Sequence, residues 1–198
     1  MGKLAVKTAL ITLASVICAF GLFIGVCFAF FPAVASDGAY SLGLYETSVS
    51  LAEREYKNRK SDEALKVLVE RAILTDSYAV VKTYAPEFLK RDTFLLIAEK
   101  EGNSFGDDGY AAFIVKGHIK ALYSLGEFSD ALGCAEVYSE NFNALYPYSY
   151  LVINAVITED KVFASEIYAS LEKENNFGDE DKQLLEKYKK SLESLING

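Results

Sequence analysis

A long uncharged segment near the N-terminus limits the possible folds of this chain more than any other feature. From Thr8 to Ser36 the sequence reads TALITLASVICAFGLFIGVCFAFFPAVAS and contains no charged residue. A bilayer core of about 30 Å is crossed by about 20 helical residues, each rising about 1.5 Å. Only a helix satisfies the backbone of a single segment in lipid, and Pro32 interrupts the helical pattern. We therefore predict a membrane anchor over residues 1–36, with one transmembrane helix over about Thr8–Phe31.

A cleaved signal peptide is the alternative for the same segment. Lys3 and Lys7 would form its basic start, and Ala33-Val34-Ala35 has the small-x-small pattern of a cleavage site. Signal peptides have apolar cores of about 7–15 residues, and this one is much longer. We favour the uncleaved anchor, with secretion after cleavage near Ala35 as the alternative.

The charges that flank the segment predict its orientation. Lys3 and Lys7 precede it, and the first basic residue after it is Arg54. The positive-inside rule therefore places the N-terminus in the cytoplasm and the remaining domain outside it, as in a bacterial envelope. Gly21 and Gly25 stand four residues apart, a spacing that lets two membrane helices pack closely and allows a homodimer; the general frequency of glycine in membrane helices is the alternative explanation for them.

Residues 37–198 show helical periodicity and no convincing strand pattern, so we predict an all-α domain. The expected helices form four consecutive pairs and one last helix, over residues 40–59 and 62–74, 78–90 and 93–101, 108–125 and 127–142, 148–158 and 160–173, and 179–196. In the last helix the apolar residues recur at steps of three and four, and the remaining positions are largely charged. Such a helix is suited to cap a stacked array.

Two observations indicate internal repetition. Alanines recur at nearly constant spacing in the second helix of each pair, at Ala64, Ala98, Ala131 and Ala164. In addition, the segment 99–108 resembles the segment 172–180, and the distance between their phenylalanines, Phe105 and Phe177, is close to two such spacings. A period of about 34 residues with two helices per unit is typical of helical-repeat proteins.

The segment LYSLGEFSDAL, from Leu122 to Leu132, resembles the turn of a tetratricopeptide repeat. Gly126 stands at the corner between the helices, Phe128 follows two residues later, and Ala131 three further on. The resemblance is specific over this repeat and degenerate over the rest of residues 40–173; for example, Ile119 stands where a small residue is usual. It implies a right-handed α-solenoid of about four hairpins that binds proteins or peptides on a concave face.

The residues that catalysis or metal binding would need are sparse in the domain. His118 is the only histidine, and Cys134 is the only cysteine beyond the hydrophobic segment, which contains Cys18 and Cys27. One histidine and one cysteine do not form a zinc site, and the acidic clusters at Asp107–Asp108 and Asp179–Asp181 lack the order of a calcium loop. We predict no enzyme activity, no metal and no cofactor. Cys134 is expected to be buried and inert, with an intermolecular disulfide as the alternative.

Charge and aromatic content point to a protein partner. Without Lys3 and Lys7 the chain has 18 basic and 28 acidic residues, which disfavours nucleic acid. An aromatic run suits peptide binding, although packing between hairpins is the alternative explanation for it. The residues expected to contact a partner are Lys116, Lys120, Tyr123, Tyr138, Phe142, Tyr146, Tyr148 and Tyr150. We predict a membrane-anchored extracytoplasmic scaffold; the alternative is a constitutive structural or assembly subunit of a larger membrane complex.

Overall fold

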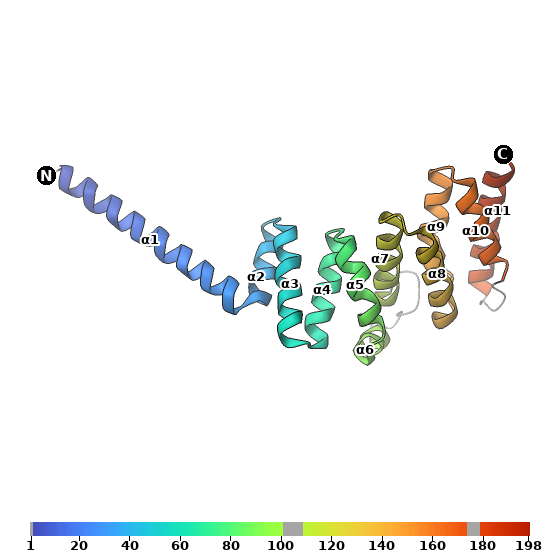
Figure 1. The fold of residues 1–198 in the computed structure, drawn as a ribbon, viewed down its shortest axis with the longest axis horizontal. Coiled ribbons are helices and arrows are strands. Elements are labelled where there is room, and N and C mark those ends of the chain that lie inside the picture. The colour runs from blue at the N-terminus through green and yellow to red at the C-terminus, as the bar shows by residue number, and fades with distance from the viewer. Residues whose placement is uncertain (1, 101–108, 174–178) are drawn as a thin grey trace. The chain divides into compact units, whose positions relative to one another are not determined.

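The computed structural model describes residues 2–100, 109–173 and 179–198, and every regular element in these ranges is a helix (Figure 1). The prediction of an all-α protein is therefore confirmed. The chain divides into two compact units, residues 1–64 and 65–198. The helices are α1 (Gly2–Phe30), α2 (Pro32–Ser41), α3 (Tyr45–Arg59), α4 (Asp62–Leu74), α5 (Tyr78–Leu89), α6 (Asp92–Lys100), α7 (Tyr110–Ser124), α8 (Phe128–Phe142), α9 (Tyr146–Ile157), α10 (Lys161–Leu171) and α11 (Asp179–Asn197).

In the first unit, the end of α1 packs against the hairpin formed by α2 and α3. Helix α1 ends at Phe30, and Pro32 occupies the first turn of α2, where its missing amide costs nothing. Phe28 packs against a small buried cluster of Ala35, Ala39 and Leu51. The Arg54 Nη1 atom of α3 donates a hydrogen bond of 3.2 Å to the Phe28 carbonyl oxygen.

Helix α2 departs from the sequence prediction, which placed a single helix over residues 40–59. The chain turns between α2 and α3 at Gly43, whose φ of 75° is open to glycine without strain. Ser36 and Ser48 are buried on the facing sides, and each hydroxyl donates a 2.8 Å hydrogen bond to the other residue's carbonyl. The domain boundary predicted at residue 36 therefore falls inside a folded helix.

Most of the predicted transmembrane segment, Thr8–Phe31, lies in α1. Side chains at 2–7, 9, 10, 27, 29 and 30 are outside the description. Among the residues that the structure does describe, no helix has the length and apolar character that crossing a bilayer requires.

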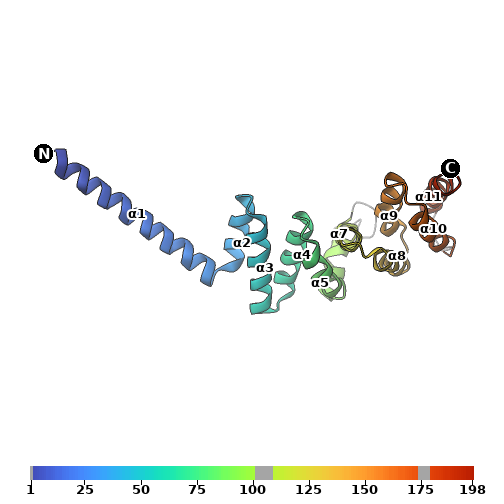
Figure 2. The ribbon, with the colours of Figure 1, turned by 45° about the horizontal axis from the view of Figure 1, so that its top comes forward.

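In the second unit, successive helices pack against one another. Helix α7 contacts α5, α8 and α9, and α9 in turn contacts α8, α10 and α11 (Figures 1 and 2). One apolar core runs through α7 to α11, and its large buried side chains include Ile119, Leu145, Tyr148, Leu151 and Ile167. Helix α11 turns Leu185 and Leu192 toward this core. Helix α4 approaches α7 closely at Gly117, where an added Cβ would lie 2.6 Å from Cδ1 of Ile73.

The same tight turn occurs five times in the described residues. Each turn has one residue with positive φ, and these residues are Gly43, Asp76, Gly126, Asn143 and Glu159. In each, the next amide donates to the carbonyl five residues before it, from Leu44 to Ala39, Ser77 to Ala72, Glu127 to Leu122, Ala144 to Ser139 and Asp160 to Ala155. This is a helix-ending motif with a left-handed residue. The interval from Gly43 to Asp76 equals that from Gly126 to Glu159, but the turn at Asn143 divides the second of these, so the five turns together do not follow one period.

These turns join α2 to α3, α4 to α5, α7 to α8, α8 to α9 and α9 to α10. The sequence prediction paired α7 with α8 and α9 with α10, and it also paired α3 with α4 and α5 with α6. Five residues after the positive-φ residue the turns place Ser48, Val81, Ala131, Tyr148 and Ala164, all buried. Of the four recurring alanines, Ala131 and Ala164 stand at this position, whereas Ala64 and Ala98 do not. Most of the segments 99–108 and 172–180, which also suggested a repeat, lie outside the described residues.

Candidate interaction surface

A groove of about 610 Å³ lies between α5 and α8 in the second unit, with α7 at its floor. Helix α5 contributes Pro86 and Leu89, α7 contributes Leu122, and α8 contributes Val137 and Phe142. Val137 is 53% exposed although it is apolar. An apolar concave surface with a few polar groups is the usual form of a binding site. We call this feature the groove.

His118 and Tyr138 form the polar part of the groove. The His118 Nδ1 atom lies 3.0 Å from the Tyr138 hydroxyl oxygen, a hydrogen bond whose direction depends on the imidazole tautomer. His118 is only 3% exposed, and burial lowers its pKa from 6.5 to about 4. Burial likewise raises the pKa of Tyr138. Both side chains are therefore neutral at pH 7, so the pair offers hydrogen bonding without charge.

The α8 wall of the groove also contains Gly133 and Cys134. A Cβ added at Gly133 would meet no atom within 4 Å, so glycine leaves this part of the wall open. Cys134 is half-buried and forms no disulfide. Burial, and to a lesser extent the negative charge of Asp130, raise the pKa of its thiol. The thiol is therefore protonated at neutral pH and weakly nucleophilic.

The two ends of the groove differ in charge. At the end nearest the start of α8, Lys82 Nζ lies 2.5 Å from Glu127 Oε1, and Asp130 stands beside this pair in the lining. At the other end, the exposed Lys90 lies opposite Asn141 and Phe142. The starts of α5 and α8 lie at the same end of the groove, where Lys82 contacts Glu127. The two ends of the groove can therefore be distinguished by their charged residues.

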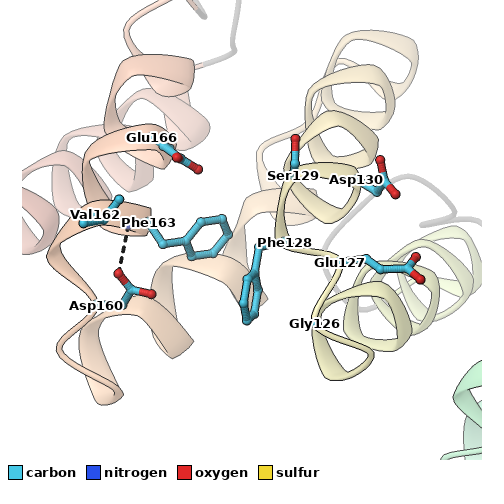
Figure 3. A pocket seen from close by; sticks show the side chains of 9 residues that line it. All are labelled: Gly126, Glu127, Phe128, Ser129, Asp130, Asp160, Val162, Phe163 and Glu166. Atoms are coloured by element: carbon cyan, nitrogen blue, oxygen red, sulfur yellow. Dashed lines mark hydrogen bonds between the residues drawn. The ribbon is translucent and has the colours of Figure 1, made fainter.

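A second hollow of about 410 Å³ adjoins the first, between the starts of α8 and α10 (Figure 3). Figure 3 shows the Phe128 and Phe163 rings turned toward each other, and their centroids are 5.6 Å apart. Four acidic residues are in the lining, Glu127, Asp130, Asp160 and Glu166, and Figure 3 shows the carboxylates of Glu127 and Asp130 pointing away from the two rings. Asp160 Oδ1 accepts a 3.0 Å hydrogen bond from the amide of Phe163 and so caps α10. We call this hollow the acidic cleft.

The structure places the predicted α7 residues away from the groove. Lys120 Nζ lies 2.6 Å from Asp76 Oδ1 and 5.8 Å from the centroid of the Tyr78 ring, and the hydrogen bond to Asp76 raises its pKa. Lys116 lies over the Tyr146 ring at 5.9 Å. The Tyr123 ring contacts those of Phe128, at 4.9 Å, and Tyr150, at 5.6 Å. The structure brings these residues together as a second surface on α7 and α9.

The predicted aromatic residues divide between core and surface. Tyr146 and Tyr148 are buried, and the Tyr148 hydroxyl lies 2.8 Å from that of Ser170, so both belong to the core. Tyr138 and Phe142 line the groove. Tyr150 is half-buried against Tyr123.

The two predicted dimerisation glycines lie on α1. A Cβ built at Gly21 or at Gly25 would meet no atom within 4 Å in the described chain. That backbone is therefore open to a close approach, and dimerisation through it stays a prediction.

Several lining residues were not foreseen from the sequence, including Pro86, Leu89, Val137 and Phe163. Part of the groove lining could have been predicted from the sequence. Asp130, Cys134 and Tyr138 recur at four-residue steps and therefore share one face of α8. Nothing local indicates that this face meets α5, which lies much earlier in the chain.

Within the described ranges, no three His, Cys, Asp or Glu side chains come close enough to hold a metal ion. No protein-family model, curated protein or solved structure matches this chain.

Proposed function

We propose that this protein is a membrane-anchored, extracytoplasmic scaffold whose helical array holds an apolar segment of a partner protein. The groove is the observation that carries the proposal, since it combines apolar side chains of three helices, the exposed Val137 among them, with an uncharged His118–Tyr138 pair. The turns support a tetratricopeptide-like solenoid, capped by α11, because the spacing from Gly43 to Asp76 recurs from Gly126 to Glu159 and is close to the usual repeat length of roughly 34 residues.

Membrane attachment through α1 is part of the same proposal. The apolar side chains described on this helix face outward on all sides; Ile17, Phe20 and Leu22 are 62%, 64% and 73% exposed. A soluble protein has no reason to expose so much apolar surface. Lys3 and Lys7 ahead of the segment support an N-terminus in the cytoplasm.

The packing of α2 favours the uncleaved anchor over a signal peptide. Cleavage after Ala35 would remove the first turn of α2 and make Ser36 the N-terminal residue. Ser36 has no exposed surface and bonds to the buried Ser48, so its new ammonium group would lie inside the hairpin interface, which is costly. N-terminal sequencing of the mature protein tests this argument, and a start at Ser36 would overturn it.

A constitutive subunit is the second candidate, and one specific surface favours it. At the turn between α9 and α10, the apolar Ile153, Ile157 and Val162 are 53%, 72% and 74% exposed. Such a patch at the tip of a hairpin is suited to permanent burial against another subunit.

Site-specific photocrosslinking in the native cell separates the two candidates. The photoreactive p-benzoylphenylalanine replaces Val137 in the groove, Ile157 in the apolar patch, or the exposed Lys190 of α11 as a control. Capture from position 137 that is lost in a Gly133→Phe background, which fills the groove, is the result expected for the scaffold. Capture from position 157 alone, undiminished by Gly133→Phe, would favour the constitutive subunit. Equal capture from all three positions would refute both.

A further inference from the structure

The groove and the acidic cleft are neighbouring parts of one surface. Ser129 and Asp130, in the first turn of α8, line both. A segment that lies along the groove and continues past this turn therefore enters the cleft. We propose that the partner segment is apolar along the groove and carries an arginine or lysine at the end that reaches the cleft. This inference rests on the scaffold function proposed above.

The charges of the cleft are the first argument. Its lining contains four carboxylates and no basic side chain. Asp130 and Glu166 form no ion pair within the described part of the chain. Glu127 uses Oε1 to bind Lys82, while its Oε2 is shielded from solvent and lacks a hydrogen-bond donor among the described residues. A cationic side chain that reaches the cleft would therefore pair with Asp130 and Glu166.

The aromatic rings are the second argument. Phe128 is 42% exposed although it packs against Phe163. The face of an aromatic ring attracts a guanidinium or ammonium group, and more strongly where carboxylates lie nearby. Val162, 74% exposed at the edge of the cleft, offers apolar contact to the methylene groups of the same side chain. An acidic residue of a partner would instead face the like charges of Asp130, Asp160 and Glu166, which disfavours it at this end.

The opposite end of the groove fixes the direction of the segment. Lys82 and Lys90 stand at the two ends of the α5 wall, eight residues or about 12 Å apart along the helix. That length accommodates about two helical turns or about four extended residues. Lys82, at the end near the cleft, is already paired with Glu127. The exposed Lys90 is the basic residue at the end of the groove remote from the cleft. The partner segment is therefore basic at the α10 end and neutral or acidic at the Lys90 end.

Binding of three matched peptide pools to the full-length chain in lipid nanodiscs tests the proposal. Each fluorescent dodecapeptide pool has the same central positions randomised among Leu, Ile, Val and Phe. One terminal pair is arginine, glutamine or glutamate and the other is glutamine, with the variable pair at the N-terminus in half of each pool and at the C-terminus in the other half. We expect the arginine pool to bind about tenfold more tightly than the glutamine pool, as one desolvated cationic contact allows, with the preference shrinking as salt is added.

The variant Asp130→Asn/Glu166→Gln should remove this preference, so that it binds the arginine and glutamine pools alike. The control Glu140→Gln/Glu186→Gln alters the net charge equally on exposed residues outside the cleft, and it should keep the preference. If all three pools bind alike, or the glutamate pool binds best, the inference fails while the groove stands. If no pool binds and position 137 captures no partner, the scaffold function itself fails.

Discussion

Replacing Gly117 with alanine should destabilise the protein, although alanine is the better helix former. In a helix interior this change stabilises by about 1 kcal/mol through propensity alone. At Gly117, however, the added Cβ would lie 2.6, 2.7 and 2.9 Å from Cδ1, Cγ1 and Cγ2 of Ile73. Atoms on both branches of the Ile73 side chain are too close, so rotation of the chain end cannot relieve the overlap. Overpacking of this kind costs about 1–3 kcal/mol, and we expect a net loss of about 1 kcal/mol.

Gly133→Ala is the matched control in a neighbouring helix. Its Cβ would meet nothing within 4 Å, so the propensity gain remains, at about 0.5–1 kcal/mol. The two alanine variants should therefore differ by roughly 2 kcal/mol, which urea unfolding followed by helical circular dichroism resolves. In an Ile73→Ala background the overlapping atoms are gone, and Gly117→Ala should then stabilise as Gly133→Ala does. If Gly117→Ala stabilises the unmodified chain as much as the control, the close approach of α4 and α7 is refuted.

Three further predictions concern buried or capping polar groups. The pKa of His118 is lowered to about 4 in the folded protein, so only the unfolded chain protonates this imidazole as the pH falls through 6.5. The free energy of unfolding should therefore drop by about 2 kcal/mol between pH 7 and pH 5. The variant His118→Phe should remove this contribution to the pH dependence of stability. Tyr148→Phe leaves the buried Ser170 hydroxyl without its partner and should cost about 1–2 kcal/mol in urea unfolding, most of it recovered by adding Ser170→Ala. Asp160→Ala removes the cap of α10 and should lower thermal stability by about 1 kcal/mol, whereas Asp160→Asn should cost little.

The helices of the second unit could be predicted from sequence because their signals are local. The predicted helices at 62–74 and 127–142 agree with α4 and α8 to within one residue, since periodicity and capping act over one or two turns. Helix α2 was missed because Pro32 was taken only as an end of the hydrophobic segment, whereas it also begins a helix.

The pairing of helices depends on turn conformation, which composition reveals only in part. Gly43 and Gly126 indicate a left-handed residue, but the equivalent turns use Asp76 and Glu159. A glutamate at positive φ gives little sequence signal, so the register was taken from alanines that do not correspond. The groove could not be predicted from the sequence for a related reason. It lies between α5 and α8, which are separated in the chain by other helices and by a segment whose length does not fit the repeat spacing.

The attachment of α1 to its neighbours has a mechanical consequence. Phe28 belongs to the same buried cluster as Ala35 and Leu51, and its carbonyl is held by Arg54, so no free linker separates the long helix from the hairpin that follows. A tilt or rotation of α1 would therefore be transmitted as torque into α2 and α3 instead of being absorbed by slack chain. If α1 resides in a bilayer, the hairpin registers the orientation of that helix directly.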